Sequence, residues 1–157
     1  MKSCLVIEES EVIASFAAGV FSDLSVEATI ATDAASAIAA LEAASPDLLF
    51  LDWDLPQLGA LDILKRLASV EEDKRPLVVM ATTENDLQQI AVARAAGVAT
   101  ILFKPYDEFQ LTEALTELGF VKPAANKKKT ASGGTKTARS ARTPRARKTR
   151  TAKKAAG

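Results

Sequence analysis

The chain of 157 residues contains no histidine and only one cysteine, one tryptophan and one tyrosine. Without histidine, Ser–His and Cys–His nucleophile pairs, most zinc sites and any phosphohistidine relay within this chain are excluded. The lone cysteine, Cys4, has no partner for an intrachain disulfide. Its place at the start of an apolar run favours a small buried side chain. A reducing cytoplasm is therefore the simpler expectation for localisation.

Long apolar runs are also missing. No stretch approaches the roughly 18 apolar residues that are needed to cross a bilayer. Three acidic residues, Glu8, Glu9 and Glu11, interrupt the N-terminal segment after Lys2. We therefore expect neither a signal peptide nor a membrane span.

Charge is distributed very unevenly, although the formal net charge is zero. Residues 1–121 contain 7 Lys+Arg and all 20 Asp+Glu, so their net charge is 7 − 20 = −13. Residues 122–157 contain the other 13 basic residues and no acidic residue. The second segment consists mainly of Ala, Lys, Arg and Thr, and it has no large apolar side chain to offset the entropy of ordering. We predict one domain over 1–121 and a disordered basic tail over 122–157.

Short apolar runs alternate with amphipathic segments throughout the predicted domain. Most of the runs are continuously apolar, as strands of a parallel sheet covered on both faces are; they cover 4–7, 26–31, 48–51, 77–81 and 99–103. Segments with helical spacing follow each run, and several begin at a capping candidate such as Ser10, Asp33 or Asp86. This alternation predicts an α/β fold with a doubly wound, five-stranded parallel sheet in the order 2-1-3-4-5.

Polar residues stand at the predicted carboxyl ends of four strands, where open parallel sheets bind their ligands. They are Glu8 and Glu9, Asp52, Thr82 and Lys104. Clustered carboxylates repel one another unless a cation lies among them, and Mg²⁺ prefers such oxygen ligands. The pattern indicates phosphoryl transfer to Asp52 as the nucleophile, with Lys104 and Thr82 neutralising the phosphoryl oxygens. We predict that Glu9, Asp52 and the main-chain carbonyl of Asp54 hold Mg²⁺, with Glu8 acting partly through water.

The domain resembles the response-regulator receiver (CheY-like) family over essentially all of residues 1–121. The matching segments are 5–10 (LVIEES), 46–56 (PDLLFLDWDLP), 78–82 (VVMAT) and 103–105 (FKP). The resemblance implies that a histidine kinase or phosphotransfer protein phosphorylates Asp52, in the presence of Mg²⁺. It also implies a cis peptide bond between Lys104 and Pro105.

The sequence departs from the family pattern in four features. The acidic pair is Glu8-Glu9, in which each side chain is one methylene longer than in the usual aspartates. Gly59-Ala60 stands in place of Asp-Gly and predicts a different loop conformation near the site. Ile101 replaces the aromatic residue that rotates on activation, and Thr83 replaces a small residue that leaves the pocket open. Trp53, which directly follows Asp52, is interpreted as a half-exposed ring without a chemical role.

The tail presents its arginines at short intervals, and we predict that they bind anions; they are Arg139, Arg142, Arg145, Arg147 and Arg150. Three interpretations remain open. The tail binds DNA or RNA through counterion release, it binds cyclic di-GMP through stacked and paired arginines, or it folds back over the acidic domain. The segment 144–147 (PRAR) resembles an AT-hook core, with Ala146 in place of glycine.

We therefore predict a two-component response regulator whose basic tail binds nucleic acid. It is not an enzyme beyond phosphorylating itself from a donor and slowly losing the phosphate. The alternative is a phosphorylation-independent adaptor whose receiver fold is a docking platform and whose tail binds cyclic di-GMP or another anionic partner.

Overall fold

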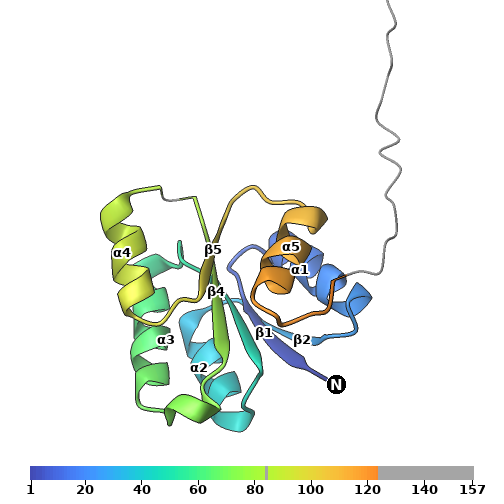
Figure 1. The fold of residues 1–157 in the computed structure, drawn as a ribbon. Helices are drawn as coiled ribbons and strands as arrows, with labels where there is room; N and C mark the ends of the chain where they lie inside the picture. The colour runs from blue at the N-terminus through green and yellow to red at the C-terminus, as the bar shows by residue number, and fades with distance from the viewer. Residues whose placement is uncertain (84, 124–157) are drawn as a thin grey trace, which may run out of the picture. The chain divides into compact units, whose positions relative to one another are not determined.

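The computed structural model of the chain describes residues 1–83 and 85–123. Five strands and five α-helices alternate along this part of the chain, with two short 3₁₀ segments (Figure 1). The strands are β1 (Ser3–Ile7), β2 (Glu27–Ala31), β3 (Leu48–Asp52), β4 (Leu77–Thr82) and β5 (Thr100–Phe103). The helices are α1 (Glu11–Asp23), α2 (Ala34–Ala43), α3 (Gly59–Ala68), α4 (Leu87–Ala95) and α5 (Glu108–Glu117).

All strand pairs are parallel, and the order in the sheet is β2-β1-β3-β4-β5. The predicted doubly wound sheet is confirmed. Helices α1 and α5 cover one face of the sheet, and α2, α3 and α4 cover the other (Figure 1). Among the described residues, no helix is both long enough and apolar enough to cross a bilayer.

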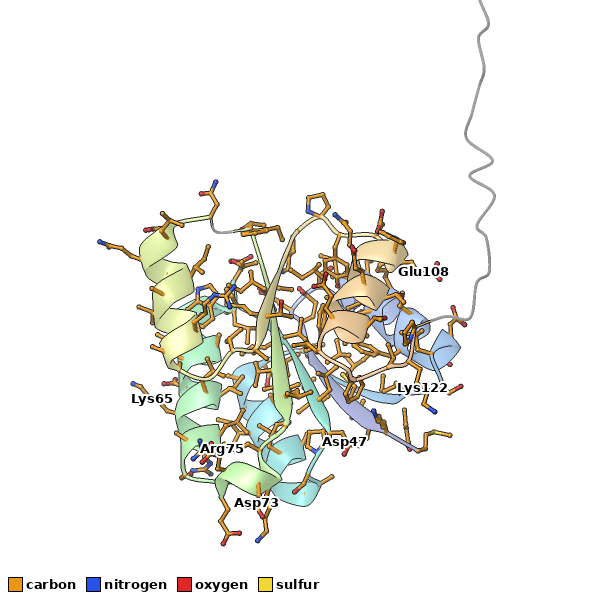
Figure 2. All side chains as sticks on the ribbon, in the orientation of Figure 1. Asp47, Lys65, Asp73, Arg75, Glu108 and Lys122 are labelled. Carbon is orange, nitrogen blue, oxygen red and sulfur yellow. The ribbon has the colours of Figure 1, made fainter. Side chains whose placement is uncertain are left out.

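The two faces of the sheet form two separate cores because side chains alternate along each strand. On β3, Leu48 and Phe50 pack toward α1 and α5, whereas Leu49 and Leu51 pack toward α2 and α3. All four are fully buried, as expected for a central parallel strand. Charged side chains such as Lys65, by contrast, lie at the outer surface (Figure 2).

Helix starts agree with the sequence signals. Ser10, Asp33 and Asp86 each accept a hydrogen bond from a backbone N–H of the first turn that follows. At α5 the N-cap is Asp107, which forms a capping box with Gln110. The N-cap Asp107 lies two residues after Pro105, and the peptide bond between Lys104 and Pro105 is cis, as predicted.

The segment that follows β3 bends before α3. Gln57 adopts a left-handed conformation (φ 59°), which is uncommon for a residue other than glycine. Gly59 is right-handed instead (φ −55°), and Ala60 is buried in the first turn of α3. The positive φ of this loop thus falls at Gln57 and not at Gly59. Addition of a Cβ at Gly59 would place it 3.1 Å from the Cβ of Ala34, so close packing against α2 favours glycine there.

Candidate functional site

The candidate site lies at the carboxyl edge of the sheet, which is the upper edge in Figure 1. Strand pairing brings its residues together: Ile7 is opposite Leu51, Asp52 is opposite Ala81, and Thr82 is opposite Phe103. The residues at or just past these pairs are Glu8, Asp52, Thr82 and Lys104. Because parallel strands end at one edge, four segments far apart in sequence deliver polar side chains to one place.

The ammonium of Lys104 is the centre of this site. Its Nζ lies 2.8 Å from Oδ1 of Asp52, 3.0 Å from Oε2 of Glu8 and 3.8 Å from Oδ2 of Asp54. The side chains of Glu8 and Asp52 are both only 3% exposed, and that of Lys104 is 11% exposed. Two buried carboxylates therefore share one largely buried cation.

Burial and hydrogen bonding act in opposite directions on the titration of these groups. Burial raises the pKa of Glu8 above its ordinary value, although the backbone N–H of Ser10 and the Lys104 ammonium favour the carboxylate. For Lys104, burial alone would lower the pKa. Its hydrogen bond to Asp52 and its contact with Glu8 outweigh that effect and raise the pKa. The two carboxylates thus favour the charged form of Lys104.

Asp54 makes more contacts than the sequence indicated. Its Oδ1 accepts a hydrogen bond from the hydroxyl of Thr82 at 3.1 Å. Its Oδ2 accepts from the backbone N–H of Thr83 at 2.9 Å and from the Thr83 hydroxyl at 3.0 Å. Its own N–H donates to Oδ1 of Asp52 at 2.9 Å. Only the main-chain carbonyl of Asp54 had been predicted to act, so its carboxylate is a site residue that sequence reasoning missed.

A signal for this role was present in the sequence. Asp54 follows Asp52 by two residues, and two consecutive threonines end the neighbouring strand. Since Asp52 is paired with Ala81, a carboxylate just after β3 lies within reach of donors just after Ala81. The Thr82 hydroxyl, which was predicted to contact a phosphoryl group, is directed to Asp54 in this structure.

The other predicted residues are placed as follows. Glu9 is exposed, and no described residue donates a hydrogen bond or ion pair to its carboxylate. Trp53 is partly buried against the α2–α3 core, in agreement with a ring at the rim. Ile101 packs against the same core. The five tail arginines lie outside the described residues.

The site offers carboxylate oxygens, which are the ligand type that a hard divalent cation such as Mg²⁺ prefers. Oε2 of Glu8 is buried and faces only the Lys104 ammonium, at 3.0 Å, so this carboxylate oxygen has room for a further cationic ligand. Asp52 supplies a second carboxylate beside it. No group of three acidic side chains within the described part of the chain is arranged to hold a metal alone. A main-chain carbonyl and water would have to fill the remaining positions.

An apolar groove of about 440 Å³ adjoins Lys104. Val12 and Phe16 of α1 line one side, and Pro105 and Tyr106 line the other. The Tyr106 ring packs on Phe16, with centroids 6.0 Å apart, and its hydroxyl is buried without a partner among the described residues. Burial raises the pKa of this phenol, and the nearby charges of Glu8 and Asp52 add to the shift.

Comparison with known proteins identifies a family for this chain. The family model described as the response regulator receiver domain matches residues 4–116. The Regulator of RpoS from Escherichia coli is 32% identical over 104 residues, which cover 66% of this chain and 30% of that protein. The chemotaxis protein CheY-3 of Vibrio cholerae is 33% identical over 88 residues, which cover 56% of this chain and 68% of that protein. The match thus spans under a third of the first relative's length.

Solved structures share the fold. The chemotaxis response regulator CheY4 of Vibrio cholerae aligns with a TM-score of 0.69 at 23% identity, over 75% of this chain and 98% of that chain. A receiver protein from Burkholderia phymatum aligns with a TM-score of 0.67 at 20% identity, over 78% and 99%. Since the family model covers well over half of its residues, this chain belongs to the response regulator receiver domain family.

Proposed function

We propose that this chain is a two-component response regulator that accepts a phosphoryl group on Asp52 from a histidine kinase or a phosphotransfer protein. The observation that carries the proposal is the contact of 2.8 Å between Asp52 and Lys104 in a buried position at the carboxyl edge of the sheet. Receiver domains are signalling proteins and not true enzymes, and phosphorylation in this family typically uses Mg²⁺.

The transfer is a displacement at phosphorus. A carboxylate oxygen of Asp52 attacks the phosphorus atom, and the bond from phosphorus to the donor's imidazole nitrogen breaks, with its electron pair staying on that nitrogen. The charge that spreads over the phosphoryl oxygens needs cationic and hydroxyl donors nearby. Lys104 supplies a fixed ammonium, and Thr82 supplies a hydroxyl once it leaves Asp54. The carboxylate of Asp52 is held for attack by the N–H of Asp54.

Bound Mg²⁺ would neutralise charge between the carboxylates and the phosphoryl oxygens. Glu8, Glu9, Asp52 and the main-chain carbonyl of Asp54 are the groups that would hold it. Glu8 is already oriented toward the site by Ser10, whose N–H donates to Oε1 at 3.1 Å. Glu9 would have to turn inward from its exposed position.

The groove beside Lys104 supports a protein as the phosphodonor. It is apolar, it is formed by α1 and the segment after β5, and it opens next to the residues that would receive the phosphoryl group. A protein that brings a phosphohistidine to Asp52 would cover Val12 and Phe16, which are exposed in this structure. This burial would contribute affinity without contact to the reacting atoms.

The experiment is phosphorylation of the full chain by acetyl phosphate with Mg²⁺, followed by intact mass measurement. We expect the mass of one phosphoryl group to be added to the wild type and to Asp62→Asn, a control at an exposed acid on α3. We expect none on Asp52→Asn. Equal incorporation into Asp52→Asn and the wild type, or no incorporation into any protein, would remove the proposal.

The basic segment supports a second proposed activity, binding of nucleic acid by the tail. Thirteen cations without a single acid in residues 122–157 favour phosphate backbones through counterion release. Affinity for DNA should therefore fall steeply as salt rises. Saturable binding of cyclic di-GMP at physiological salt, lost in Arg142→Ala/Arg145→Ala, would favour the adaptor instead. An absence of binding to either ligand would leave the tail without a nucleotide partner.

A further inference from the structure

Asp54 connects the two strands that carry the proposed phosphoacceptor and its threonine. Three hydrogen bonds reach its carboxylate, one from the Thr82 hydroxyl and two from Thr83. All three donors lie at the end of β4, whereas Asp54 belongs to the turn after β3. The carboxylate is 32% exposed, so it is not a packing element of either core.

These contacts conflict with the role that transfer requires of Thr82. A hydroxyl has a single proton to donate. While that proton is donated to Oδ1 of Asp54, it is not available to an oxygen of a phosphoryl group on Asp52. The Asp54 carboxylate is a charged acceptor, so its hydrogen bond with the Thr82 hydroxyl must break before that hydroxyl can donate to the phosphoryl group.

Electrostatic repulsion by the Asp54 carboxylate also opposes phosphoryl transfer to Asp52. Oδ2 of Asp54 lies 3.8 Å from the ammonium of Lys104, which Asp52 and Glu8 already share. An incoming phosphoryl group would bring more negative charge to this cation. The Asp54 carboxylate, held at the rim of the site by Thr83, therefore adds repulsion where charge develops.

From these contacts we infer that Asp54 is a positioning residue that slows phosphoryl transfer by holding the Thr82 hydroxyl away from Asp52. This inference rests on the proposed function. Transfer proceeds when Thr82 exchanges its acceptor, from Oδ1 of Asp54 to the phosphoryl group. Asp54 thus sets the rate of the reaction without bonding to the reacting phosphorus. Its main-chain carbonyl and N–H are unaffected by side-chain substitution.

The test measures the rate of acetyl phosphate incorporation at Asp52 by intact mass, at one Mg²⁺ concentration, in the full chain. We expect Asp54→Ala to react about tenfold faster than the wild type, which corresponds to about 1.4 kcal/mol of activation free energy. Asp54→Asn keeps an acceptor for the Thr82 hydroxyl and should fall between the two. Asp62→Ala, which removes an exposed acid from α3, should match the wild type.

Dependence on Thr82 distinguishes this role from a purely structural or electrostatic one. In a Thr82→Ala background, the Asp54→Ala substitution should give a much smaller acceleration than in the wild type, because there is no hydroxyl to release and only the repulsion near Lys104 is removed. Thermal unfolding of each variant, followed by circular dichroism, verifies that the compared proteins are folded. Should Asp54→Ala be unfolded, the inference is tested by the rates of phosphate incorporation in Asp54→Asn and Asp62→Ala, of which Asp54→Asn should be the faster.

The outcomes separate the two claims. If the wild type gains phosphate at Asp52 but Asp54→Ala is no faster than Asp62→Ala, the inference is wrong and the proposed function stands. The inference is also wrong if Asp54→Ala accelerates the Thr82→Ala protein equally. If Asp54→Ala gains phosphate and the wild type does not, the inference is supported. If none of the proteins gains phosphate, the proposed function fails and the inference fails with it.

Discussion

Removal of the Lys104 ammonium should destabilise the domain by an amount that depends strongly on pH. In Lys104→Met the stem of the side chain is kept, but Glu8 and Asp52 lose the cation that both of them contact at 3.0 Å or less. Removal of one partner from a buried ion pair costs about 3–5 kcal/mol when the other charge must stay ionised.

Glu8 has a way to reduce this cost, because it can bind a proton. Its ordinary pKa is 4.5, and burial already raises it in the folded protein. Protonation at pH 7 costs about 3.4 kcal/mol from that starting value, whereas at pH 5 it costs about 0.7 kcal/mol. We therefore expect a loss of about 3 kcal/mol in unfolding free energy at pH 7 and of about 1 kcal/mol at pH 5.

The direction in which the stability of Lys104→Met changes with pH follows from proton binding by Glu8. In Lys104→Met the pKa of Glu8 in the folded state rises further, whereas the unfolded chain keeps the ordinary value. The folded protein then holds a proton that the unfolded chain releases above about pH 4.5, so stability decreases as pH rises through this window. Below that pH both states are protonated, and the deficit relative to the wild type is smallest.

Urea unfolding at pH 5 and pH 7 measures the effect, with the fluorescence of Trp53 as the reporter of folding. Lys65→Met, at an exposed lysine on α3 (Figure 2), is the matched control and should change stability by no more than about 0.5 kcal/mol at either pH. In Glu8→Gln/Lys104→Met, the cost at pH 7 should fall to about the value at pH 5. An equal loss at both pH values, or one that Glu8→Gln does not relieve, would refute the reasoning.

Three further predictions concern the fold and are tested by urea unfolding. Gly19→Ala should add about 0.8–1 kcal/mol, since Gly19 is an exposed position inside α1 with open space around it, whereas Gly119→Ala should cost about 1 kcal/mol because φ there is +71°. The backbone N–H of Ser36 lowers the pKa of the helix cap Asp33, so this contribution is present above the ordinary value of 3.8 and is lost as pH falls. Asp33→Asn keeps the cap without this titration, and its midpoint relative to the wild type should rise on acidification. Ile63→Ala, at a fully buried position, should cost about 2–5 kcal/mol and Ile63→Val about 0.5–1.5 kcal/mol.

The sheet and the convergence of the site were predictable because they follow from periodicity and parallel topology. Short apolar runs separated by capped amphipathic segments allow few arrangements other than a doubly wound sheet. Once the strands are parallel, residues that follow β1, β3, β4 and β5 must meet at one edge. The contact of Lys104 with Asp52 is a consequence of that arrangement.

Side-chain direction just beyond a strand was harder to predict. Glu8 and Glu9 are chemically alike, and the sequence analysis assigns Glu9 the larger role as a metal ligand. The structure instead buries Glu8 against Lys104 and exposes Glu9. Alternation along β1 explains the difference, because consecutive side chains leave the strand on opposite sides. The hydrogen bonds of Asp54 depend on the turn after β3, whose left-handed Gln57 carries no glycine signal.

The charges of this site connect stability and reactivity through one residue. Buried Glu8 has a raised pKa, so the fold would be more stable if this carboxyl were neutral, yet a neutral carboxyl is a poor ligand for a cation. Lys104 reduces that conflict by lying between Glu8 and Asp52. Asp54 then competes for the same ammonium from the rim while it binds the Thr82 hydroxyl. Three ionised carboxylates around one lysine leave an excess of negative charge, and a phosphoryl group on Asp52 would add to this excess, so a bound cation would favour phosphorylation.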